Sequence, residues 1–70
     1  MPSTAIRDVR YNAEREQLQV TFVSGRTYVY LNVPESVYAA FTTSASQGAF
    51  FNRFIRDRFR HRELAKVASW

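Results

Sequence analysis

The chain has 70 residues, of which 46% are hydrophobic, and its ten basic and six acidic side chains give a formal net charge of +4. This length fits one domain, and a chain this short buries only about 60% of the surface that it exposes when unfolded. With no cysteine and one histidine, the composition predicts neither a disulfide framework nor a zinc site, and we expect no cofactor. The core must therefore consist of aliphatic and aromatic side chains, with a homodimer as another way to cover apolar surface.

The start of the chain, residues 1–5, shows no basic segment followed by an apolar run, so no signal peptide is predicted. No apolar stretch approaches the roughly 18 residues that a membrane span needs. We therefore expect a cytoplasmic protein with no membrane partner.

Three strands are predicted first, over residues 6–11, 17–23 and 26–31. In the second, Leu18, Val20 and Phe22 alternate with polar residues, as in a half-buried strand. Short turns join the three segments, which favours an antiparallel β-meander.

Helical spacing follows, over residues 34–43 and 46–58. Pro34 suits a first helical turn, and either Ser44 or Ser46 could cap the second helix. The sequence thus predicts an α+β fold, a three-stranded antiparallel β-meander followed by two α-helices packed on one face. The expected core is Val9, Leu18, Val20, Phe22, Val37, Phe41, Phe51 and Ile55.

Three pieces of the sequence together resemble a known family: Tyr28-Val29-Tyr30, Asn32-Val33-Pro34-Glu35-Ser36-Val37-Tyr38, and Gly48-Ala49-Phe50-Phe51-Asn52-Arg53-Phe54-Ile55-Arg56. Their order and spacing resemble the KTSC domain over roughly residues 5–62. That family is named for its occurrence at the C-terminus of some lysyl-tRNA synthetases, and it also occurs as small stand-alone bacterial proteins. The resemblance implies the fold class, and RNA binding has been suggested for the family.

Two positions depart from the family pattern. Position 54, more often polar in the family, is Phe54, and the segment after Phe59, which usually carries a tyrosine or proline, is Arg60-His61-Arg62. The expected organisation is an N-terminal arm over residues 1–5, one KTSC-like domain over residues 6–62, and a tail or frayed helix over residues 63–70.

No catalytic centre is apparent. His61 lies between two arginines, the acidic residues are scattered, and the sequence contains neither a phosphate-binding glycine loop nor a nucleophile elbow. We therefore expect a binding module, with no enzyme activity and no small-molecule substrate.

Clustered arginines are the main functional signal. On a helix, Arg53, Arg56 and Arg60 would share one side, where planar guanidinium groups suit phosphates. Further basic groups at the margin of this surface are Arg58, Arg62 and Lys66. The alternative is a solvated face in which Asp57 pairs with Arg53 or Arg60.

Tyr28 and Tyr30 could stack on unpaired bases or pack under the helices, and hairpin register decides between these. A three-residue loop over residues 23–25 would pair Val20 with Tyr28 and bury both tyrosines, whereas a two-residue loop would expose them; we favour the former. Asn52 is a lesser candidate for ligand binding. We prefer a structural role, in which its side-chain amide binds a backbone group of the preceding loop.

The function predicted from these features is nucleic-acid binding, with RNA preferred, through the arginine-rich helix face. The alternative is a protein-interaction or self-associating module that uses exposed aromatic residues such as Phe54 and Trp70.

Overall fold

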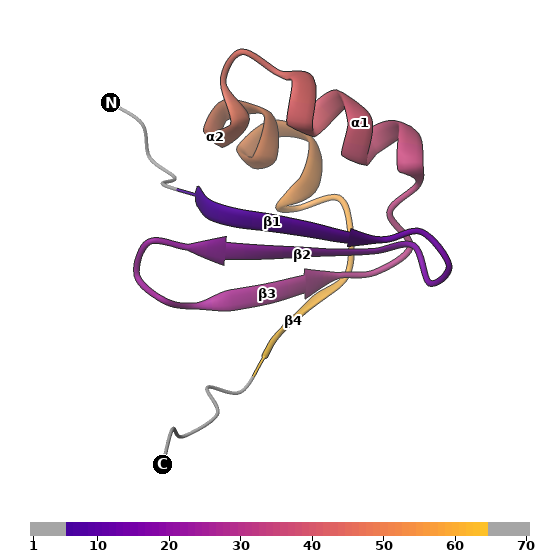
Figure 1. The fold of residues 1–70 in the computed structure, drawn as a ribbon, viewed down its shortest axis with the longest axis horizontal. Helices are drawn as coiled ribbons and strands as arrows, with labels where there is room; N and C mark the ends of the chain where they lie inside the picture. The colour runs from indigo at the N-terminus through magenta and orange to yellow at the C-terminus, as the bar shows by residue number, and fades with distance from the viewer. Residues whose placement is uncertain (1–5, 65–70) are drawn as a thin grey trace.

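A computed structural model describes residues 6–64, which form a four-stranded antiparallel sheet covered on one side by helical segments (Figure 1). The strand order is β1-β2-β3-β4, so each strand pairs with its neighbours in sequence. The elements in chain order are β1 (Ile6–Asn12), β2 (Gln17–Phe22), β3 (Thr27–Tyr30), α1 (Glu35–Thr43), α2 (Gln47–Phe50), the π-helical segment η1 (Phe51–Ile55) and β4 (His61–Glu63).

The β2–β3 hairpin has the register that buries the tyrosines. Val20 lies opposite Tyr28 and Leu18 opposite Tyr30. The amide of Gly25 donates to the carbonyl of Phe22 (2.8 Å), and Gly25 has a φ of 95°, which favours a residue without a Cβ. The three-residue loop is therefore confirmed, and both tyrosines lie on the helix-covered side of the sheet.

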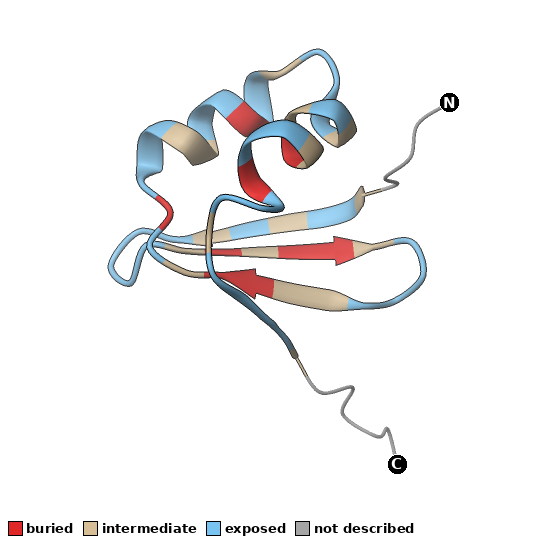
Figure 2. Cartoon of the chain, turned by 180° about the vertical axis from the view of Figure 1, so that it is seen from behind, coloured by how far each residue is buried: buried red, intermediate tan, exposed pale blue. Residues whose placement is uncertain are grey.

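Side chains from this side of the sheet meet the helices in one core, seen as the buried segments of Figure 2. The fully enclosed members include Leu18, Val20, Phe41 and Ile55, and Phe51 is 3% exposed. Three other residues predicted for the core are only partly buried and pack against it: Val9, Phe22 and Val37. Two residues of this core that the prediction omitted are Tyr30 and Val33; Val29 is also buried, but on the other face of the sheet, where it lies opposite Gln19.

The predicted three-stranded sheet is wrong in one respect, because His61–Glu63 forms a fourth strand on the outer edge of β3. Hydrogen bonds flank the pairing on both sides: Leu31 donates to the carbonyl of Arg60 and Leu64 to that of Thr27, each at 2.8 Å. This strand supplies partners to backbone groups that would otherwise stay unpaired at the edge. Ordered pairing thus extends to Leu64, and the rest of the expected tail, like the expected N-terminal arm, lies outside the described residues.

The second helix is also shorter and less regular than the α-helix predicted over residues 46–58. Ser46 caps α2 by accepting a bond from the amide of Ala49, and Arg56 then donates to the carbonyl of Phe51 in the i→i+5 pattern of a π-helix (2.9 Å). After Ile55 the chain turns and passes behind the sheet to reach β4 (Figure 1). The helix therefore ends early because residues 56–60 form the connection to β4.

The segment between β3 and α1 is fixed by two contacts with the first hairpin. Asn32 adopts a left-handed φ of 58°, which asparagine tolerates, and Pro34 follows as the N-cap of α1. The hydroxyl of Tyr11 donates to the carbonyl of Val33 at 2.7 Å, and the amide of Val33 donates to the carbonyl of Glu16 at 2.8 Å. The Asn-Val-Pro piece of the sequence therefore sets how α1 leaves the sheet.

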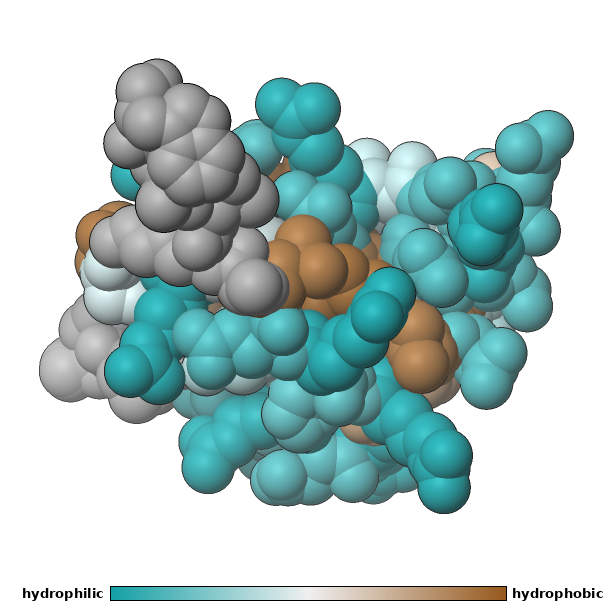
Figure 3. Space-filling model, turned by 90° about the horizontal axis from the view of Figure 1, so that it is seen from below, coloured by the Kyte–Doolittle hydropathy of each residue, from teal (hydrophilic) through white to brown (hydrophobic). Residues whose placement is uncertain are grey.

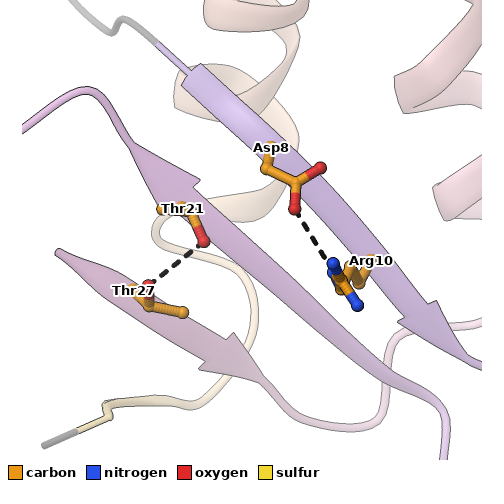
Figure 4. A network of polar contacts seen from close by, with 4 residues as sticks. All are labelled: Asp8, Arg10, Thr21 and Thr27. Carbon is orange, nitrogen blue, oxygen red and sulfur yellow. Dashed lines mark hydrogen bonds and ion pairs between the residues drawn. The ribbon is translucent and has the colours of Figure 1, made fainter. Parts of the chain in front are cut away.

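The side of the sheet away from the helices is polar. Asp8 and Arg10 form an ion pair at 3.3 Å, and the hydroxyls of Thr21 and Thr27 lie 3.1 Å apart across two strands (Figure 4). Seen from below, the molecule is mostly hydrophilic with a smaller apolar area near its centre (Figure 3). Among the described residues, none of the helices has the length and apolar character required to cross a bilayer.

Candidate functional site: an aromatic cavity with two arginines

A cavity of about 380 Å³ lies where the β2–β3 hairpin, η1 and β4 come together. Its size is within the range typical of ligand pockets, about 300–1,000 Å³. The lining residues are Phe22, Ser24, Arg26, Tyr28, Tyr30, Phe51, Asn52, Arg56, Asp57 and His61. Residues 22–30 and residues 51–61, which are distant in sequence, therefore contribute to one site.

Aromatic rings build the apolar part of this cavity. Phe51, the first residue of η1, meets both Phe22 and Tyr30 edge-on, each with ring centroids 5.4 Å apart. Phe22 in turn meets Tyr28 edge-on at 5.7 Å. Since edge-to-face contacts are favourable for aromatic pairs, the rings hold one another in fixed orientations.

His61 reaches the same cluster from β4. It pairs with Tyr30 in the sheet, so its side chain projects on the helix-covered side. Its ring lies 5.1 Å from that of Tyr30 with 33° between the planes, and 5.7 Å from that of Tyr28. Tyr30 is only 3% exposed, whereas Tyr28 is half-buried and His61 is exposed. Tyr28 and His61, together with the half-buried Phe22, are therefore the rings that a ligand can reach.

Two arginines and one acid supply the charge. At the hairpin end, a hydrogen bond with Tyr28, followed by the effect of the Glu63 carboxylate 3.9 Å away, raises the pKa of Arg26, so this guanidinium stays charged. Arg56 and Asp57 come from the turn that follows η1. Two guanidinium donors, from Arg26 and Arg56, and one carboxylate acceptor, from Asp57, thus line an aromatic cavity.

Burial raises the pKa of Tyr30 to about 12, with the neighbouring Tyr28 acting in the same direction. The charge of Arg56 opposes this shift of the pKa, and that of Asp57 adds to it. Arg56 and Asp57 therefore both lie within electrostatic reach of the Tyr30 hydroxyl. At neutral pH this hydroxyl is protonated and can donate a hydrogen bond.

The structure divides the predicted site residues into two groups. Those that line the cavity are Tyr28, Tyr30, Asn52 and Arg56. Those that are exposed and do not line it are Arg53, Arg58, Arg60 and Arg62. Lys66 lies outside the described residues.

The continuous helix that was expected to carry Arg53, Arg56 and Arg60 is not observed, because the helical segment ends at Ile55. Arg60 lies in the connection to β4, and Arg62 lies opposite Val29 in the sheet. Arg62 therefore projects on the opposite side of β4 from His61. Only Arg56, at the end of η1, turns out to border the cavity.

The sequence did not single out Phe22, Ser24, Arg26 or Asp57 as site residues, and it interpreted His61 as a solvated side chain. One signal could have indicated the hairpin residues: the preferred register already placed Phe22 on the same side as Tyr28 and Tyr30. No comparable signal existed for His61, because a three-residue polar strand has too little alternation to be recognised.

Ion pairs, metal-binding groups and exposed apolar side chains of the described residues bear on the other predictions made from the sequence. The two ion pairs within residues 6–64 are Arg10–Asp8 and Arg26–Glu63, so Asp57 is not held at ion-pair distance by Arg53 or Arg60. Within the same range, no group of three or more histidine, aspartate or glutamate side chains could hold a metal ion. Two large apolar side chains are exposed there, Val23 at 63% and Phe54 at 44%, and Phe54 packs on Phe50.

Sheet, helices and cavity together define a small α+β domain with an aromatic site at one end of its sheet. A protein-family model described as the KTSC domain matches residues 2–59, so the chain belongs to the KTSC domain family. The family that the three sequence pieces resemble is thereby confirmed.

Relatives of two kinds share the domain. A lysine–tRNA ligase from Trichormus variabilis is 32% identical over 60 residues, which are 86% of this chain but only 11% of the ligase. A protein from Tsukamurella paurometabola is 34% identical over 58 residues, which are 83% of this chain and 87% of that protein. The chain thus spans about a tenth of the ligases that it matches and most of the small relative.

The crystal structure of a KTSC domain protein from Yersinia pestis has a similar fold. It superimposes with a TM-score of 0.81 at 31% identity, covering 93% of this chain and 94% of that one. The α+β fold class is therefore that of the family.

Proposed function

We propose that this domain is a non-catalytic module that binds single-stranded RNA and holds one unpaired nucleotide in the aromatic cavity. The observation that carries the proposal is the meeting of the Tyr28 and His61 rings with the guanidinium groups of Arg26 and Arg56 at one cavity. Sequence-specific RNA-binding proteins commonly stack unpaired bases on aromatic side chains and contact phosphates with arginine.

The aromatic rings supply the stacking surface. A base that stacks on an aromatic side chain contributes roughly 1–3 kcal/mol to the binding of a single strand. Tyr28 is braced by Phe22, and His61 by Tyr30, so a base would meet rings that are already oriented. A preorganised surface of this kind reduces the entropy lost on binding.

Positive charge supplies attraction for the backbone. Arg26 from the hairpin and Arg56 from the end of η1 both line the cavity and can contact the phosphates of a bound nucleotide. Exposed arginines at positions 58, 60 and 62 add charge along the connection to β4, and the whole chain carries a net charge of +4. Binding should therefore weaken steeply with salt, because each phosphate contact releases condensed counterions.

Two further observations support this proposal. Lysine–tRNA ligases carry a similar domain, and these enzymes act on an RNA. The cavity itself offers one carboxylate, from Asp57, and an imidazole in contact with tyrosine rings, without the paired acids or the nucleophile–base pair of common hydrolases. Association by shared domain is a weaker argument than the site itself.

The test compares Arg56→Ala with Arg53→Ala, a matched control from the same helical segment that is exposed and outside the cavity. Fluorescence anisotropy with a labelled oligouridine, repeated over a salt series, measures affinity and its salt slope. Arg56→Ala should weaken binding about tenfold and lower the slope by roughly one, whereas Arg53→Ala should have a smaller effect. A melting curve for each variant separates lost contacts from lost folding.

Absence of RNA binding by the unmodified chain at low salt would refute the proposal. Equal affinities for the two variants would refute the cavity as the binding site. Sedimentation covers the alternative function: a dimer that persists at high salt and disappears in Phe54→Ala would favour a self-associating module.

A further inference from the structure

Among the described residues that line the cavity, Asp57 carries the one carboxylate. It follows Arg56 in the turn after η1 and lines the cavity together with Arg26 of the β2–β3 hairpin. Asp57 is exposed where it lines the cavity, and its charge contributes to the raised pKa of Tyr30 in the aromatic cluster.

A carboxylate disfavours a phosphate close to it, because the two negative charges repel each other. Its side chain accepts hydrogen bonds only, through two oxygens that can serve two adjacent donors. In a cavity with cationic walls, Asp57 therefore suits the part of a nucleotide that presents N–H groups, which is the edge of the base.

Bases differ in how many adjacent donors this edge presents. Guanine carries an N1–H beside a 2-amino group, so both oxygens of one carboxylate can accept from it at once. The Watson–Crick edges of adenine and cytosine present one amino group next to a ring acceptor, and that of uracil presents one N–H between two carbonyls. Guanine thus gains a second charge-assisted bond that the others cannot form.

The remaining groups fit the same orientation. Arg56, adjacent to Asp57, can donate to the O6 carbonyl of a guanine whose N1–H faces the carboxylate. The base would then stack along Tyr28 and His61, and Arg26, which also lines the cavity, can contact its phosphate.

We propose that Asp57 makes the cavity selective for guanine by accepting hydrogen bonds from N1–H and the 2-amino group. This inference rests on the proposed function and specifies which nucleotide the cavity prefers.

The experiment uses the full chain and three short single-stranded RNAs: one of adenines only, one with a central guanine, and one with inosine at that position. Inosine keeps N1–H and O6 but lacks the 2-amino group. Guanine should bind about tenfold tighter than adenine at this position, with inosine between them, as expected for one bidentate pair. Affinities come from anisotropy competition at one salt concentration.

Asp57→Asn should abolish most of this preference while the adenine RNA binds as well as before or better, because a repelling charge is removed. The matched control is Asp8→Asn, which makes the same change of charge on the polar side of the sheet and should keep the preference. Melting curves verify that both variants fold.

Each outcome has a distinct meaning. If none of the three RNAs binds, the proposed function fails and the guanine inference fails with it. If all three bind equally, RNA binding stands and guanine selectivity is refuted. If guanine is preferred equally by Asp57→Asn, or if inosine matches guanine in the unmodified chain, the carboxylate does not make the second bond and the inference is overturned.

Discussion

Replacing Phe51 by alanine should destabilise the domain more than any change on its surface. The side chain is 3% exposed and its ring contacts Phe22 and Tyr30, each at 5.4 Å between centroids. Truncating a buried phenylalanine costs about 3–5 kcal/mol, and the loss of two edge-on ring pairs places this site toward the upper end. A domain of this size has a total stability of about 4–10 kcal/mol, so the loss is comparable to the whole.

Urea unfolding followed by circular dichroism measures this loss. Phe54→Ala is the matched control, because Phe54 lies three residues further in the same π-helical segment but is 44% exposed. Its replacement should cost no more than about 1 kcal/mol. If the two variants lose the same stability, Phe51 is not a core residue and the orientation of η1 described above is wrong.

Two further predictions concern the sheet. Because the pKa of Tyr30 is raised to about 12 from its usual 10, its neutral form stabilises the fold fully below pH 10, and this contribution disappears as the pH rises from 10 to 12. Urea unfolding across this range should show a loss of about 2 kcal/mol, reduced in Tyr30→Phe; an identical loss in that variant would assign the effect to other groups. Gly25→Ala should cost about 1–2 kcal/mol from backbone strain alone, because Gly25 has a φ of 95° and no atom lies within 4 Å of an added Cβ. Its control, Ser24→Ala in the same loop, should stay within about 0.5 kcal/mol, and equal losses would show that the left-handed turn is not needed.

The family and most of the fold could be predicted from the sequence, because they depend on local patterns. Alternation in residues 17–23 specified β2, and the glycine of the hairpin loop limited its register with β3 to two alternatives, of which the structure has the favoured one. The Asn32-Val33-Pro34 piece marked the start of α1 within one residue, since proline restricts the backbone there. These signals act over a few residues and need no knowledge of distant contacts.

The candidate site could be predicted only in part. Tyr28, Tyr30, Asn52 and Arg56 were named from the sequence, and all four line the cavity. The single helix expected to carry the arginines is wrong, because helical spacing was assumed to continue through residue 60 when the helix ends at Ile55; phosphate binding by these arginines stays a prediction. Spacing places side chains on one side only while the regular element lasts.

What the sequence by itself indicated is therefore the order of the first three strands and the two helices, and more than half of the buried core; it left two registers open for the β2–β3 hairpin. What only the tertiary structure decided is the use of residues 61–63 as a fourth strand and, with it, the position of His61. The physical reason is that a short polar strand has no hydrophobic pattern of its own; it forms because the edge of β3 offers unpaired backbone groups. The cavity depends on that pairing, since His61 reaches Tyr30 only when the chain returns across the sheet to pair with β3.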